Sequence, residues 1–119
     1  MNTIVNIDEI LLNELNDEND WTTLIMYNKF NESFLLQFKD KVNWGLATQY
    51  QDFSETFIEE HMDLFNWEMI CFYQNLSEEF LIKNIDKLSI GWLMFNKKIP
   101  LNIKDKIIKM KGNKNGNII

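Results

Sequence analysis

Tryptophan recurs at an interval of 23 residues in this chain, at Trp21, Trp44 and Trp67. With each tryptophan taken as repeat position 1, apolar residues recur at positions 4, 10, 14 and 15, Tyr at 7, Glu at 12 and Asp at 20. A period of roughly 20 to 50 residues is typical of repeat proteins, in which each copy buries its apolar face against its neighbours. The interval therefore predicts an array of small, similar units.

The copies fill most of the 119 residues, a length that fits one domain. A decayed copy, residues 90–111, is expected to cap the array, and residues 112–119, which contain Gly112 and Gly116, are expected to be a flexible tail. The sequence thus predicts a single helical-repeat domain over residues 1–111. Its earlier parts are a half repeat at 5–20 and full repeats at 21–43, 44–66 and 67–89.

Two repeat positions carry, in successive copies, side chains of the kind that cap helices; residues at the same repeat position are called a column. The oxygens of such side chains accept hydrogen bonds from the free N–H groups of a first helical turn. They are Asp8, Asn31, Ser54 and Ser77 at position 11, and Asp20, Asn43, Asn66 and Ser89 at position 23. Two caps predict two helices per copy, near positions 1–9 and 12–20, each too short to be stable alone. The predicted fold is all-α, a solenoid-like array of short helix–turn–helix repeats; a curled, compact bundle is the alternative.

Helical spacing places positions 1, 4 and 7 on one face of the first helix, and positions 14, 15 and 18 on one face of the second. The Trp and Tyr columns are therefore expected in the core. They are not expected to be stacking platforms for bases, which normally lie in a positively charged groove.

The charge balance disfavours nucleic acid as a partner. Eighteen acidic residues face twelve Lys, a net charge of -6, and the chain contains no Arg. Binding to nucleic acid depends on cationic contacts to phosphate. We therefore expect no direct nucleic-acid binding.

Catalytic and metal-binding chemistry is also disfavoured. His61 and Cys71 are the sole histidine and cysteine, so neither a disulfide nor a multi-histidine metal site can form within the chain. No third residue orients them as a catalytic pair, and no glycine-rich phosphate loop is present. We expect no enzyme activity, cofactor or metal. The unpartnered cysteine favours a cytoplasmic location, and the absence of a long apolar run predicts no membrane span.

Two surfaces are candidate binding sites. An apolar stripe at positions 3 and 6 is either buried between neighbouring helices or an exposed partner groove with aromatic anchors. Its residues are Met69, Phe72, Trp92 and Phe95. An acidic face along the second helices is either solvated surface or a patch that docks on a basic protein. Its residues are Glu55, Glu59, Glu60, Glu78 and Glu79.

The lysine-rich segment Lys104–Ile119 predicts a short amphipathic helix up to about Lys111. A capping helix is the favoured interpretation of this segment. A role at a membrane or on nucleic acid is the alternative, although the segment carries little charge for either.

The repeat, read from Trp44 to Ile58 and again from Trp67 to Leu81, resembles a short repeat of phage and large-DNA-virus proteins. The resemblance covers roughly residues 5–104 and departs in the last copy, where Asn96 replaces Tyr and Leu101 replaces Glu. It implies a binding scaffold. As a class, small acidic phage proteins often occupy a host protein, including defence nucleases.

Together these features predict a non-catalytic protein–protein interaction module, such as an anti-CRISPR-like inhibitor of a host protein. We expect a monomer or a small homo-oligomer. The alternative is a structural protein that self-associates by stacking its terminal repeats.

Overall fold

The computed structural model describes residues 18–114 of the chain. These residues form helices joined by turns, with no β-strand among them, so the predicted all-α fold is confirmed. Two compact units make up the chain, Met1–Leu64 and Phe65–Ile119. Most of the predicted half repeat at 5–20, and the end of the predicted tail, lie outside the described residues. Continuous solenoid stacking stays a prediction.

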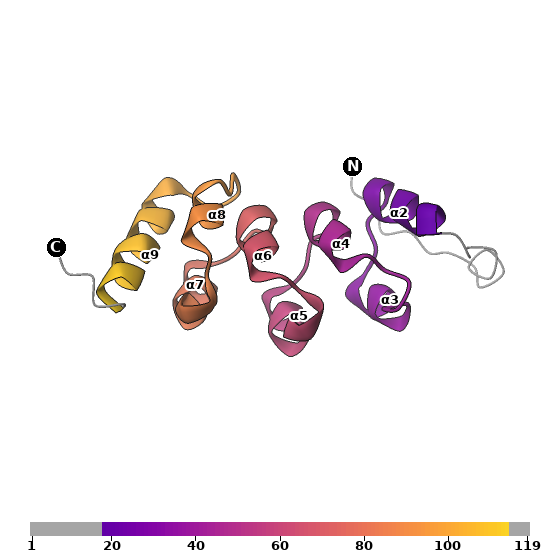
Figure 1. Cartoon of the computed structure of the whole chain (residues 1–119), viewed down its shortest axis with the longest axis horizontal. Helices are drawn as coiled ribbons and strands as arrows, with labels where there is room; N and C mark the ends of the chain where they lie inside the picture. Colours follow the sequence, from indigo (N-terminus) through magenta and orange to yellow (C-terminus); the bar gives the residue numbers. More distant parts are fainter. Residues whose placement is uncertain (1–17, 115–119) are drawn as a thin grey trace. The chain divides into compact units, whose positions relative to one another are not determined.

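The first unit contains two repeats of a longer helix followed by a shorter one. Helix α2 lies beside α4, and each is followed by the second helix of its own repeat (Figure 1). The second helices, α3 and α5, have six residues each. The elements are α2 (Glu18–Tyr27), α3 (Glu32–Gln37), α4 (Trp44–Tyr50), α5 (Glu55–Glu60) and the 3-10 turn η1 (Met62–Leu64).

The second unit repeats this pattern and then ends on a longer helix. Helix α6 packs beside α8, and α9 packs against α7, η2 and α8. Because α9 has fourteen residues, it is the longest of the described helices. The elements are α6 (Trp67–Tyr73), α7 (Glu78–Lys83), the 3-10 turn η2 (Ile85–Lys87), α8 (Ile90–Met94) and α9 (Leu101–Lys114).

Most of the predicted capping residues are confirmed. Ser89 precedes α8 but makes no side-chain capping hydrogen bond, and Asp8 lies outside the described residues. A side-chain oxygen accepts a first-turn N–H at Asn31, Asn43, Ser54, Asn66 and Ser77. The predicted cap at Asp20 is wrong, because α2 already begins at Glu18 and Asp20 lies inside its first turn. The helices are also shorter than expected: α4 and α6 end at position 7, and α5 and α7 at position 17, before a 3-10 turn.

Each repeat is held together by a stack of its Trp on the Phe at position 14. The ring centroids are 6.2 Å apart for Trp21 and Phe34, 6.3 Å for Trp44 and Phe57, and 5.9 Å for Trp67 and Phe80. The next column, position 15, is fully buried in all three repeats; it consists of Leu35, Ile58 and Leu81. The second helix of each repeat therefore contributes a fully buried residue to the core, as the first helices do at Ala47 and Ile70.

The tyrosine column does not form the core, contrary to the prediction. Tyr27 is 76% exposed, and Tyr50 and Tyr73 are half-buried. Position 7 is the last residue of these helices, so its side chain lies at a helix end. Position 5 is buried instead, at Ile25, Thr48 and Cys71.

Buried carboxamide side chains join one repeat to the next. In the first unit, the Gln51 side-chain nitrogen donates to the carbonyl oxygens of Ile25 (2.8 Å) and Asn28 (2.6 Å), and its oxygen accepts from the Phe30 N–H (3.0 Å). The two carbonyls lie near the C-terminus of α2, where helix carbonyls lack intrahelical partners. Gln51 is 2% exposed, so these bonds form away from water.

Asn96 makes the equivalent contacts in the second unit. Its side-chain nitrogen donates to the carbonyl oxygens of Cys71 (2.7 Å) and Gln74 (2.8 Å), and its oxygen accepts from the Lys98 N–H (2.8 Å). Asn96 stands at position 7, one residue earlier than Gln51 does in its repeat. Since α8 ends at Met94, the chain leaves the helix early and a position-7 residue reaches the carbonyls.

Lysines of α9 dock that helix on the rest of the second unit. The Lys104 ammonium donates to the carbonyl oxygen of Asn96 at 2.7 Å, and the Lys111 ammonium donates to those of Ile85 and Leu88 at 3.0 Å. Lys106 pairs with Glu78. The helix continues through Gly112 to Lys114, beyond the end expected near Lys111.

Candidate binding groove

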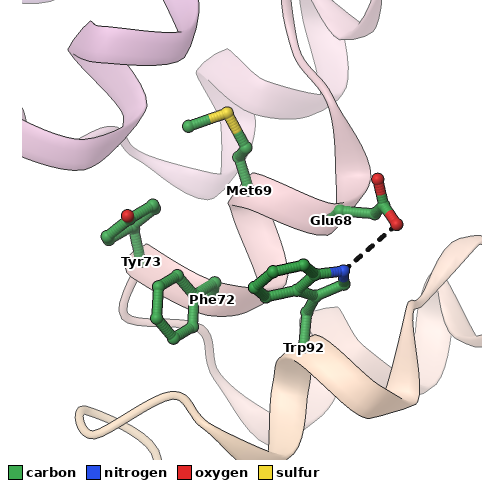
Figure 2. Close-up of a pocket in the computed structure, with 5 residues that line it drawn as sticks. All are labelled: Glu68, Met69, Phe72, Tyr73 and Trp92. Carbon is green, nitrogen blue, oxygen red and sulfur yellow. Dashed lines mark hydrogen bonds between the residues drawn. The ribbon is translucent and has the colours of Figure 1, made fainter.

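A groove in the second unit gathers aromatic side chains around one carboxylate. Its volume is about 190 Å³. Four of its residues come from α6 and the fifth comes from α8 (Figure 2). The lining residues are Glu68, Met69, Phe72, Tyr73 and Trp92.

The rings of the groove contact one another edge to face. Phe72 lies 5.4 Å from Trp92 and 4.5 Å from Tyr73 between ring centroids, with interplanar angles of 65° and 63°. The Trp92 indole N–H donates to the Glu68 carboxylate at 3.1 Å, as the dashed line in Figure 2 shows. This bond fixes the edge of the indole, while 44% of Trp92 stays exposed.

Three of the four predicted stripe residues lie together in this groove. Met69 and Phe72 are half-buried, whereas Trp92 is exposed. Phe95, the fourth, is 68% exposed at the end of α8 and does not line the groove. The four stripe residues therefore neither are all buried between neighbouring helices nor all line one exposed groove.

Two lining residues were absent from the predicted site. Tyr73 had been assigned to the core with the other tyrosines. Glu68 stands at position 2, where the other copies carry Thr22, Gly45 and Gly91. A charged residue in a column of small residues is the sequence signal that could have identified it.

The acidic residues of the predicted face belong to both units and differ in their surroundings. Glu55, Glu59 and Glu60 lie on α5 of the first unit, and Glu78 and Glu79 lie on α7 of the second. Glu60 and Glu79 are exposed. The Glu78 carboxylate accepts a hydrogen bond from the Lys106 ammonium at 2.5 Å, and this ion pair joins α7 to α9.

The recurring Glu at position 12 has a structural role in the first unit. The Glu32 carboxylate accepts hydrogen bonds from both the backbone N–H and the hydroxyl of Ser54, the latter at 3.0 Å. Ser54 is the cap of the next repeat's second helix. Glu32 therefore joins two successive repeats, in addition to lying in the first turn of its own helix, where the helix dipole favours a negative charge.

His61 and Cys71 lie in different units. The His61 ring packs on Phe57 with 4.6 Å between ring centroids. Cys71 is completely buried on α6, and burial raises the pKa of its thiol. A thiol held in its neutral form is a poor nucleophile.

We expect Cys71 to react slowly with a thiol reagent such as dithionitrobenzoate in the folded protein. Reaction requires an opening of the structure, and an opening that costs about 3 kcal/mol slows labelling roughly a hundredfold. The measurement compares labelling in buffer with labelling in concentrated urea. Equal rates in the two solutions would contradict the burial of this side chain.

Within residues 18–114, no helix is both long and apolar enough to span a membrane. The same part of the chain contains no group of three or more His, Cys, Asp or Glu side chains that could hold a metal ion.

The two units differ in charge: Met1–Leu64 carries a net charge of -10, and Phe65–Ile119 a net charge of +4.

Comparison with protein-family models, curated proteins and solved structures finds no match for this chain.

Proposed function

We propose that this protein is a non-catalytic protein–protein interaction module that binds its partner through the groove between α6 and α8. The exposed indole of Trp92 carries the proposal. Tryptophan is enriched among the residues that dominate binding energy at interfaces, and clustered aromatic and Met side chains are typical of interface centres. Met94, on the same short helix, and Phe95, directly after it, are also exposed and would extend the contact.

The fold supports this function because hydrogen bonds connect the two helices that line the groove. The Asn96 side chain, in the turn after α8, donates to a carbonyl oxygen of α6, and Lys104 of α9 donates to the carbonyl oxygen of Asn96. A preformed surface loses less conformational freedom on binding. The host-protein inhibitor predicted from the phage-type repeat is one form of this proposal.

The proposal can be tested with peptides selected from a displayed random library against the immobilised full chain. We expect selected peptides to bind Trp92→Ala at least about tenfold more weakly, because truncating a central aromatic anchor commonly costs 2 kcal/mol or more. Tyr27→Ala is the matched control, since it removes another exposed aromatic ring, in the first unit. Equal binding to all three proteins would contradict the groove as the binding surface.

Self-association is the second candidate, favoured by the exposed Phe95 and Leu101, which are 68% and 66% exposed. Light scattering over a concentration series separates the two functions. A mass that rises with concentration, and that returns to the monomer value in a Phe95→Ala/Leu101→Ala variant, would support self-association. A constant monomer mass would exclude it.

A further inference from the structure

We propose that the groove between α6 and α8 receives a guanidinium group, supplied as an arginine side chain of the partner protein. This inference rests on the proposed function, because it names the chemical group that the same groove would bind. The aromatic rings, the carboxylate and the composition of the chain each support it.

The aromatic lining suits a cation. Phe72, Tyr73 and Trp92 all contribute rings to the groove, and a cation within about 6 Å of a ring centroid is attracted by the negative ring face. Trp is the strongest of the three ring types in this interaction. A wholly apolar ligand would use the same rings but would leave the carboxylate at the groove without a partner of opposite charge.

Glu68 supplies that charge. It is the one charged residue among the five that line the groove. Its carboxylate accepts the Trp92 indole N–H at 3.1 Å, and an ionised carboxylate has about four acceptor sites, so it can accept further donors. The indole bond also orients the carboxylate beside the ring on which a cation would stack.

Arginine fits this pair of features better than lysine. A planar guanidinium stacks on an aromatic face and donates through several N–H groups at fixed angles, whereas an ammonium is a compact, strongly hydrated charge. The chain contains no arginine, so the group comes from another molecule. Lys104, Lys106 and Lys111 of the same unit are bonded to backbone carbonyls or to Glu78, and none of them lines the groove.

The test is an NMR titration of the full chain that follows the indole N–H signal of Trp92, assigned with a Trp92→Phe variant. The two probes are N-acetyl-arginine amide and N-acetyl-citrulline amide, which have nearly the same shape and differ in charge. We expect a saturable shift with arginine and binding at least about tenfold weaker with citrulline. Equal affinity for the two probes would overturn the proposal.

The second part of the test replaces the Glu68 carboxylate. Glu68→Gln keeps an oxygen near the indole N–H but removes the charge, so arginine binding should fall to about the level of citrulline. Asp105→Asn, at an exposed acid of the same unit, is the control and should bind arginine as the unaltered chain does. Undiminished arginine binding by Glu68→Gln would overturn the proposal.

The two proposals fail in distinguishable ways. If library peptides require Trp92 but arginine shows no preference over citrulline, the groove is a docking surface and the guanidinium inference is wrong. If arginine binds with the expected preference but library peptides bind independently of Trp92, the guanidinium site holds and the docking function is wrong.

Discussion

Asn96→Ala is expected to lower the free energy of unfolding by about 3 kcal/mol, since each buried polar group left without a partner costs about 1–3 kcal/mol. The substitution removes the donors to the carbonyl oxygens of Cys71 and Gln74 and the acceptor of the Lys98 N–H. Asn96 is completely buried, so water cannot replace these bonds without rearrangement. Urea unfolding followed by far-ultraviolet circular dichroism measures the loss.

The matched control for Asn96→Ala is Asn102→Ala on α9, where the side chain is exposed. We expect this control to change stability by no more than about 0.5 kcal/mol, as is usual for surface substitutions. If the two variants were equally stable, Asn96 would not be the connection that the structure indicates.

Leu81→Ala is expected to destabilise the protein by about 2–5 kcal/mol, the range for truncating a fully buried leucine. Leu81 lies on α7 and is 0% exposed. The cost includes both the lost burial and the cavity that remains where the surrounding helices do not collapse. The same urea unfolding experiment measures it.

Leu101→Ala provides the comparison for Leu81→Ala, because it makes the same chemical change at a residue that is 66% exposed. It should cost well under about 1 kcal/mol, since little apolar area is lost from the core. A similar loss of stability for both variants would show that position 15 does not lie in the core.

The repeat could be predicted because its period is carried by large side chains and by caps. Trp44 stacks on Phe57, and Asn43 and Ser54 cap the two helices of that repeat, all as the spacing indicated. Local interactions of this kind depend on residues close in sequence. The all-α fold class follows from them directly.

The environment of the tyrosine column was predicted wrongly because the first helices end at position 7, earlier than the expected position 9. A helix of nine residues would carry position 7 on its buried face, but α4 and α6 stop at that position. The cap at Asp20 was wrong for a related reason: α2 begins earlier than the repeat register predicts.

The carboxamide connections have a counterpart in the sequence. Position 8 reads Asn28, Gln51 and Gln74, a column of amides in the three full repeats. The role of Asn96 could not be predicted from this column, because it depends on where α8 ends. A one-residue change in helix length moves the contact from position 8 to position 7.

The groove was partly predictable. Met69, Phe72 and Trp92 share one side of neighbouring first helices, and helical spacing is sufficient to place them together. The inclusion of Glu68 depends on its hydrogen bond with Trp92 of the neighbouring helix. The exclusion of Phe95 depends on where α8 ends, because the helix stops at Met94. The repeat pattern specifies neither.

Hydrogen exchange measured by NMR tests most directly whether buried amide side chains join successive repeats. The side-chain NH₂ groups of Gln51 and Asn96 should exchange far more slowly than that of the exposed Asn102 in the same spectrum, because they are bonded to buried carbonyls. Exchange of all three at the rate of a solvated amide would contradict the account.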